Sequence, residues 1–145
     1  MSLDSAPQPD LALEIDPSCG GQSRVEGEYS AGAPELIVEI SHTTSARDGG
    51  AKLRLYERSG VREYVTVRPE PRQIVWRELA DGRYREIAAE EDGIFRSRVF
   101  RGLWLDPTPL WTVDLPGVAA TVQRGIATPE HAAFVDLLAS SRRGT

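Results

Sequence analysis

The sequence is poor in the residues that build disulfides and histidine metal sites. Cys19 is the single cysteine, so an internal disulfide is excluded and a reducing environment such as the cytoplasm fits best. The two histidines, His42 and His131, stand too far apart in the chain for a histidine-rich metal site. No apolar run approaches the roughly 20 residues that a membrane helix needs, and no charged-then-apolar signal segment occurs near Met1. We therefore expect a cytoplasmic protein without a membrane part.

The chain also lacks an excess of basic residues over acidic ones. The formal net charge of the 145 residues is −5, which argues against broad nonspecific binding of nucleic acid through a basic surface. A local groove is compatible with this balance, because metal-binding carboxylates add negative charge to any nuclease. The composition, 40% hydrophobic and 27% charged, is that of an ordinary globular protein, so one domain over residues 1–145 is expected.

The most informative stretch spans residues 33–60. Its pattern predicts a buried strand, a short polar turn and an amphipathic helix ended by Gly60. Glu39 lies within the strand, and apolar residues occupy one face fully and the other in part. Burying a carboxylate there costs several kcal/mol unless a cation, a metal ion or hydrogen-bond donors compensate it. Glu39 is therefore either a functional acid or a structural acid paired with an arginine.

The predicted helix carries three polar side chains along one side. Asp48, Lys52 and Tyr56 are spaced by four residues, so they follow one another on the helix surface. Lys52 has two interpretations of equal weight: its ammonium converges with Glu39, or it pairs with Asp48 across one helical turn. Three residues are candidates to cap the start of the helix, namely Thr43, Thr44 and Ser45.

The rest of the chain predicts further strands and helices. In chain order they are a strand over 10–16, an irregular connection over 16–34, a strand over 61–69, a hairpin of 73–79 with 82–88, an apolar strap over 95–110, and helices over 115–126 and from 129 onward. The helix between the two central strands is long enough for a parallel crossover. Asp10 sits at the start of the first strand, where a turn or capping acid is the commonest use. The connection is either a cover over a site or a surface loop.

Basic and aromatic residues alternate on the predicted hairpin. They are Arg72, Arg77, Arg83 and Arg85, interleaved with Trp76 and Tyr84. Such a ribbon can grip nucleic acid. An exposed antiparallel face with charges that protect the sheet edge is the favoured interpretation.

Several segments together resemble the bacterial Uma-two family of restriction endonucleases, in the PD-(D/E)XK nuclease superfamily. The resemblance rests on PQPDLALEID, GAPELIVEIS, the helix with Lys52 and Tyr56, GVREYVTV, GLWLDP and ATPEHAAF, which together span nearly the whole chain. It implies an α/β (α+β) fold with a restriction-endonuclease-like mixed sheet. A strand-helix-strand core, an added β-hairpin and C-terminal helices complete the expected architecture.

The resemblance also implies a site. Asp10 matches the aspartate of the Pro-Asp motif and Glu39 the second acid, and these two are the expected ligands of Mg²⁺ or Mn²⁺. Ser41 occupies the position where the superfamily usually has its lysine, and Lys52 on the helix is expected to substitute for that lysine. Ser41 and Asp48 are expected to support the ligands. A hard cation polarises the phosphate and activates water, and a lysine stabilises the developing charge.

Members of the family generally carry a helix and another acid ahead of the Pro-Asp strand. By this comparison the chain is expected to be short at its N-terminus, with residues 1–9 as a flexible arm. Two functions follow as expectations. The first is a magnesium-dependent DNA endonuclease with catalytic Asp10, Glu39 and Lys52. The alternative is a catalytically degenerate member that serves as a binding or dimerisation module, in which a homodimer covers the edge of the first strand.

Overall fold

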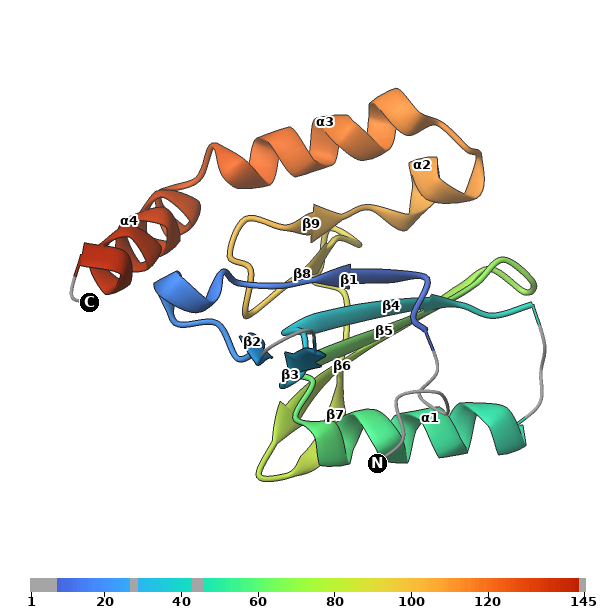
Figure 1. The fold of residues 1–145 in the computed structure, drawn as a ribbon. Coiled ribbons are helices and arrows are strands. Elements are labelled where there is room, and N and C mark those ends of the chain that lie inside the picture. Colours follow the sequence, from blue (N-terminus) through green and yellow to red (C-terminus); the bar gives the residue numbers. More distant parts are fainter. Residues whose placement is uncertain (1–7, 27–28, 43–45, 144–145) are drawn as a thin grey trace.

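A five-stranded mixed sheet forms the centre of the computed structural model, which describes residues 8–26, 29–42 and 46–143 (Figure 1). The strands lie in the order β1, β4, β5, β6 and β7. Their bounds are β1 (Leu11–Leu13), β4 (Leu36–Ile40), β5 (Glu63–Arg68), β6 (Gln73–Ala80) and β7 (Arg83–Ile87). β4 and β5 are parallel, and the other neighbouring pairs in this sheet are antiparallel.

Helix α1 (Ala46–Ser59) connects the two parallel strands and lies along one face of the sheet (Figure 1). Gly60, with φ of 85°, ends the helix in the left-handed conformation that glycine adopts without strain. The predicted strand-helix-strand unit is confirmed. Together with the hairpin and the C-terminal helices, it confirms the predicted restriction-endonuclease-like α+β fold.

The predicted hairpin of β6 and β7 is confirmed as well. Its two turn residues, Asp81 and Gly82, both have positive φ, at 53° and 79°. This is the conformation of the tight turn that suits the twist of two antiparallel strands.

The connection over residues 16–34 is more ordered than the sequence indicated. The expectation of an irregular loop is wrong, because the segment contains a short helix and a small hairpin: η2 (Pro17–Cys19), β2 (Arg24–Glu26) and β3 (Tyr29–Ala31). These elements have three residues each, which is too short for a period to show. Residues 1–7 of the expected N-terminal arm lie outside the described part of the chain.

A buried acid fixes this connection to the sheet. Glu35 is 1% exposed, and its two carboxylate oxygens accept hydrogen bonds from the N–H groups of Ile15, at 2.8 Å, and Gln22, at 2.7 Å. Ile15 precedes η2 and Gln22 follows it. Glu35 therefore has a structural role.

Apolar side chains pack on both faces of the sheet. On the α1 side the buried cluster consists of Ala33, Ile37, Tyr56, Val61 and Tyr64. On the opposite side, Leu36, Val65 and Trp76 pack against apolar residues of the strap. The sheet is thus the middle layer between α1 and the C-terminal part of the chain (Figure 1).

The C-terminal part consists of two short strands and three helices. Their bounds are β8 (Phe95–Arg96), β9 (Trp104–Leu105), α2 (Pro107–Trp111), α3 (Leu115–Ile126) and α4 (Pro129–Arg143). The predicted strap and both predicted helices are confirmed, with Thr128 Oγ1 accepting from the N–H of His131 at the start of α4. Helix α2 was not predicted. Among the described helices, none has the length and apolar character needed to cross a membrane.

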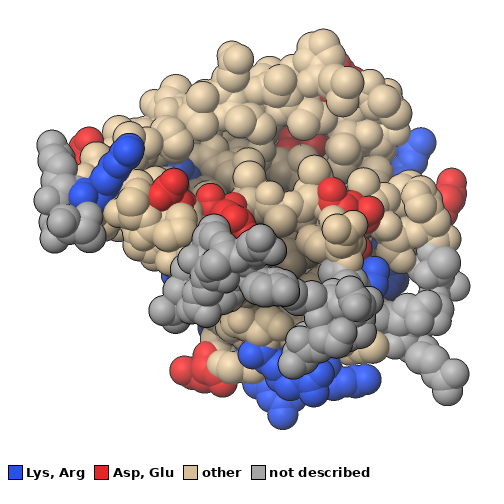
Figure 2. Space-filling view, viewed as in Figure 1, with Lys and Arg blue, Asp and Glu red and all other residues tan. Residues whose placement is uncertain are grey.

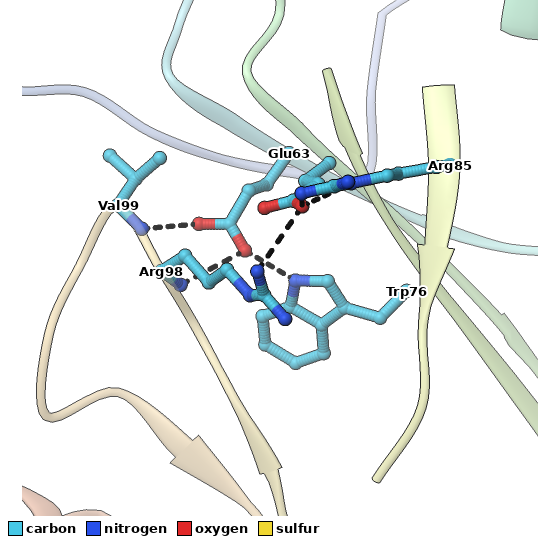
Figure 3. Close-up of polar contacts among 6 residues, drawn as sticks. Glu63, Trp76, Arg85, Arg98 and Val99 are labelled. Carbon is cyan, nitrogen blue, oxygen red and sulfur yellow. Dashed lines mark hydrogen bonds and ion pairs between the residues drawn. The ribbon is translucent and has the colours of Figure 1, made fainter. Parts of the chain in front are cut away.

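A second buried acid, Glu63, holds the strap to the sheet (Figure 3). It is 0% exposed, and its carboxylate accepts from Trp76 Nε1 at 2.5 Å, Ser97 Oγ at 2.6 Å and the N–H of Val99 at 2.8 Å. The N–H of Arg98 lies at 3.4 Å. These donors come from β6 and from the strap, so one side chain at the start of β5 joins both.

Candidate functional site

Glu39 is a buried acid on the face of the sheet that α1 covers. Side chains on β4 alternate between the faces, so Glu39 lies on the same side as Ile37 of the α1 core. Glu39 is 6% exposed although it carries a carboxylate. An ionised group at this depth requires donors or a cation around it.

Two residues of α1 provide these partners. Lys52 Nζ lies 3.3 Å from Glu39 Oε2, and the hydroxyl of Tyr56 donates a hydrogen bond of 2.7 Å to Glu39 Oε1. Lys52 and Tyr56 are one helical turn apart, so both side chains reach the same position on β4. The ammonium and the carboxylate thus converge, and Glu39 pairs with a lysine, not with an arginine.

Tyr56 is a partner of Glu39 that the sequence did not reveal. Its spacing of four residues from Lys52, on the same side of the predicted helix, was the available signal. Burial raises the pKa of the Tyr56 phenol, and the hydrogen bond to Glu39 raises it further. The hydroxyl therefore stays protonated at neutral pH and remains a donor to the carboxylate.

Asp10 lies beside Glu39 at the edge of the sheet. In the antiparallel register of β1 and β4, Leu11 is opposite Val38, and one further step places Asp10 opposite Glu39. Asp10 Oδ2 accepts a hydrogen bond of 2.7 Å from the N–H of Ile40. The side chain is exposed. The N–H of Ile40 at the end of β4 thus fixes the position of the Asp10 carboxylate.

Two further residues, Ser41 and Asp48, were expected to support the ligands, and the structure describes the surroundings of Ser41 only. Ser41 directly follows β4, and its N–H donates to the carbonyl of Val67 at 2.9 Å, which extends the β4–β5 ladder. Asp48 belongs to the first turn of α1, but its side chain lies outside the described residues. The candidate caps Thr43, Thr44 and Ser45 also lie outside them.

A basic residue of the hairpin also belongs to this face. Arg77 on β6 is half-buried, and its Nη1 donates to Thr66 Oγ1 at 2.9 Å. The guanidinium carbon of Arg77 lies 4.9 Å from the centre of the Tyr64 ring. The expectation that the hairpin arginines form an exposed, edge-protecting face is therefore wrong for Arg77. The sequence contained a signal for this position, because side chains alternate along a strand and Arg77 must therefore face away from the buried Trp76.

The donor set can be compared with what a metal ion requires. Within the described residues, no three acidic, histidine or cysteine side chains gather into a metal site. Asp10 directly precedes β1, Glu39 lies on the neighbouring β4, and Asp10 Oδ1 has no hydrogen-bond partner in that part of the chain. Magnesium and manganese accept a few carboxylates and complete their coordination with water. The pair therefore fits such an ion.

Comparison with protein-family models matches residues 1–108 to Uma2, which is described as "Putative restriction endonuclease". The match covers more than half of the chain and includes Asp10, Glu39 and Lys52. A search of curated proteins found no match. On the extent of the family match, this chain belongs to the Uma2 family.

Proposed function

We propose that this chain is a metal-dependent DNA endonuclease that hydrolyses phosphodiester bonds. One arrangement supports the proposal: the β1–β4 register, extended by one residue before β1, puts Asp10 opposite Glu39, and Lys52 contacts Glu39. Two carboxylates and an ammonium supply what hydrolysis of a phosphodiester needs, namely ligands for a hard cation and positive charge near the phosphate. Membership in Uma2 supports the nuclease class.

Asp10 and Glu39 would hold Mg²⁺ or Mn²⁺ through carboxylate oxygens. When bound, such an ion polarises the phosphate and lowers the pKa of an attacking water. The hydroxyl of Tyr56 fixes one oxygen of Glu39, and the N–H of Ile40 fixes one oxygen of Asp10. Both carboxylates thereby keep their orientation without using all of their lone pairs.

Lys52 is proposed to stabilise the negative charge that develops on the phosphate. Its side chain is 38% exposed, so the ammonium contacts Glu39 and still reaches the surface. Lys52 is also the single lysine of the chain, and every other basic side chain apart from histidine is arginine. A lysine is a compact charge on a flexible stem, unlike the planar guanidinium. Ser41 and Asp48 are proposed to support the ligands from the strand end and the helix start.

DNA is the proposed substrate although the net charge is −5. In the view of Figure 2, lysine and arginine side chains gather over α1, whereas the surface over α3 carries few charges. A phosphate backbone is drawn to the basic side of a protein even when the total charge is negative. We therefore propose that the DNA approaches from the side of α1. Residues 1–145 are proposed to act as one domain.

The metal requirement gives a direct test. At a Mg²⁺ or Mn²⁺ concentration about ten times the Kd, binding is expected to stabilise the fold by about 1.4 kcal/mol. Thermal melting with and without the ion measures this shift. Asp10→Asn is expected to remove it, because a neutral amide oxygen replaces a charged ligand. A plasmid-nicking assay on the same samples is expected to show cutting by the unaltered chain only with the ion present.

The matched control is Asp81→Asn. Asp81 is an exposed acid in the hairpin turn, and asparagine tolerates its positive φ. This variant is expected to keep both the metal shift and the cutting. If Asp10→Asn melts with the same metal shift as Asp81→Asn, the two-carboxylate site is wrong.

A second candidate function, a binding or dimerisation module without catalysis, is favoured by the apolar surface around β1. Leu11, Leu13 and Ile40 are 60%, 42% and 44% exposed. They line an apolar groove of about 370 Å³ between the sheet and the strap with α2 and α3. β1 is an edge strand of the sheet, and such edges pair with a second strand.

If this module function holds, a second copy is the proposed occupant and the chain should sediment as a dimer at micromolar concentration. Leu11→Lys places a charge on the apolar edge and is expected to yield the monomer. Val113→Lys is the matched control, since Val113 is 77% exposed and outside this groove. A chain that remains monomeric at every concentration would remove the dimerisation module from consideration.

A further inference from the structure

Two arginines extend the polar face that carries Glu39. In the parallel register Glu39 is beside Thr66, and alternation along β5 puts Tyr64 and Arg68 on the same face as Thr66. Arg77 is opposite Tyr64 on β6 and belongs to this face as well. A continuous polar row therefore leads from Glu39 across β5 to β6.

Neither arginine has a carboxylate within ion-pair distance in the described part of the chain. The side chain of Arg77 donates its hydrogen bond to Thr66. Arg68 Nη1 lies 3.5 Å from Gln73 Oε1, and the buried Arg68 Nε has no hydrogen-bond partner there. A guanidinium offers five N–H donors, and Arg68 Nε is the buried one that has no partner within the described residues. Moving a cation from water to a partly buried position costs free energy, and a bound anion would offset that cost.

Arginines on the opposite face of the sheet differ from one another in their pairing. Arg85 and Arg98, both labelled in Figure 3, form ion pairs with Glu78. Within the described residues, Arg85 on that face is thus paired, whereas Arg83 on the same face forms no ion pair.

Nearby acids do not supply the missing charge. Glu86 is opposite Arg77 on β7, but it is exposed and does not form an ion pair with it. Both oxygens of Glu39 already have partners on α1. Burial lowers the pKa of the Arg77 guanidinium, the charges of Tyr64 and Glu86 raise it, and the neighbouring charge of Arg68 lowers it. Among the described residues, no carboxylate therefore neutralises Arg77 by direct contact.

We propose that Arg68 and Arg77 form a phosphate-binding pair that holds a backbone phosphate of the nucleic-acid strand next to the Glu39–Lys52 centre. The inference deepens the proposed nuclease function and rests on it. A guanidinium matches the oxygens of a phosphate group with two parallel hydrogen bonds, which is the recognition that arginine provides best. Thr66 and Tyr64 hold the Arg77 side chain in place before the phosphate arrives.

The spacing suits a phosphate near the one that is cut. Arg77 is two strands away from Glu39 and two residues further along β6, which corresponds to about 12 Å at the usual strand dimensions. One strand of DNA rises about 3.4 Å per nucleotide. The pair therefore contacts a phosphate within about three nucleotides of the scissile bond. Its role is to fix the register of the strand in the site.

Equilibrium binding without divalent metal tests the proposal apart from cleavage. The probe is a short fluorescein-labelled DNA duplex in EDTA, and fluorescence anisotropy is followed across a salt series. Arg68→Gln and Arg77→Gln are each expected to weaken binding about tenfold and to reduce the slope of log K against log salt by about one. Arg77→Lys keeps the charge and is expected to restore the slope while binding stays weaker.

The matched control is Arg83→Gln. Arg83 is an exposed arginine of the same hairpin on the opposite face of the sheet, and its loss is expected to leave the salt slope unchanged. If Arg68→Gln and Arg77→Gln keep the slope and affinity of Arg83→Gln, the phosphate-binding pair is wrong. The same conclusion follows if the unaltered chain does not bind the duplex. Thermal melting identifies a variant that does not fold. If one of the two arginine variants fails in this way, the binding data of the other variant test the proposal.

The proposed nuclease function is tested by a different measurement from the one that tests the phosphate-binding pair. The magnesium-dependent melting shift depends on Asp10 and Glu39, so Arg68→Gln is expected to keep it. Loss of DNA binding with a retained metal shift supports the phosphate-binding pair. If the unaltered chain shows no metal shift but its DNA binding depends on Arg68 and Arg77, the nuclease proposal falls and the phosphate site stands.

Discussion

Replacing Glu63 with alanine is expected to lower the free energy of unfolding by about 4 kcal/mol. The Glu63 carboxylate is fully buried and accepts hydrogen bonds from Trp76, Ser97 and Val99. In the variant these three donors remain in the interior without an acceptor, and each such group costs about 1–3 kcal/mol. The missing side chain also leaves a cavity. Urea unfolding followed by circular dichroism measures the loss.

Glu78→Ala is the matched control at the neighbouring position. Glu78 is opposite Glu63 in the β5–β6 register, but its partners Arg85 and Arg98 are exposed. Ion pairs of this kind contribute at most about 1 kcal/mol, so the control is expected to unfold close to the unaltered chain. Equal midpoints for the Glu63 and Glu78 variants would show that the strap does not depend on Glu63.

Three buried acids show how far sequence can predict a role. Glu35, Glu39 and Glu63 all stand at or beside strand positions with apolar neighbours, and all are 6% exposed or less. Only Glu39 was singled out from its position and the resemblance. The other two accept hydrogen bonds from backbone or side chains distant in sequence, such as Ile15 for Glu35 and Ser97 for Glu63. Such partners are set by tertiary packing, which local pattern does not encode.

Element length decided which parts of the fold were predictable. The crossover with α1, the Asp81–Gly82 turn and helices α3 and α4 have strong local signals in periodicity, turn chemistry and capping. β2, β3 and α2 contain three to five residues, and each is stabilised by its surroundings. Asp106, for example, caps α2 by accepting from the N–H of Thr108 at 3.1 Å, but a two-residue signal of this kind is common in loops.

The polar face around Glu39 was only partly predictable for the same reason. Spacing by four residues placed Lys52 and Tyr56 on one side of α1, and the register of β1 with β4 then brought Asp10 beside them. Arg68 and Arg77 join this face only through the pairing of β5 with β6. Which hairpin arginine faces α1 depends on that register, because a slip of one residue would exchange the faces.

The largest expected effect on chemistry follows from replacing Lys52 with methionine. Methionine keeps most of the side-chain length but removes the ammonium that lies 3.3 Å from Glu39 Oε2. If Lys52 stabilises the charge that develops on the phosphate, the cleavage rate is expected to fall about 100- to 1,000-fold. Stability is expected to change by less than about 1 kcal/mol, because the lysine side chain is 38% exposed and Tyr56 still donates to Glu39. Single-turnover nicking at saturating metal and DNA measures the rate.

Tyr56→Phe separates this electrostatic role from the positioning of Glu39. It removes the hydrogen bond to Glu39 Oε1 and leaves the ammonium in place, so a smaller loss of rate, about tenfold, is expected together with weaker metal binding. Lys52→Met is expected to reduce the rate with metal binding retained. Wild-type nicking by Lys52→Met would leave Lys52 as a counter-ion of Glu39 alone. Catalysis would then rest on Asp10, Glu39 and the metal ion that they are proposed to hold.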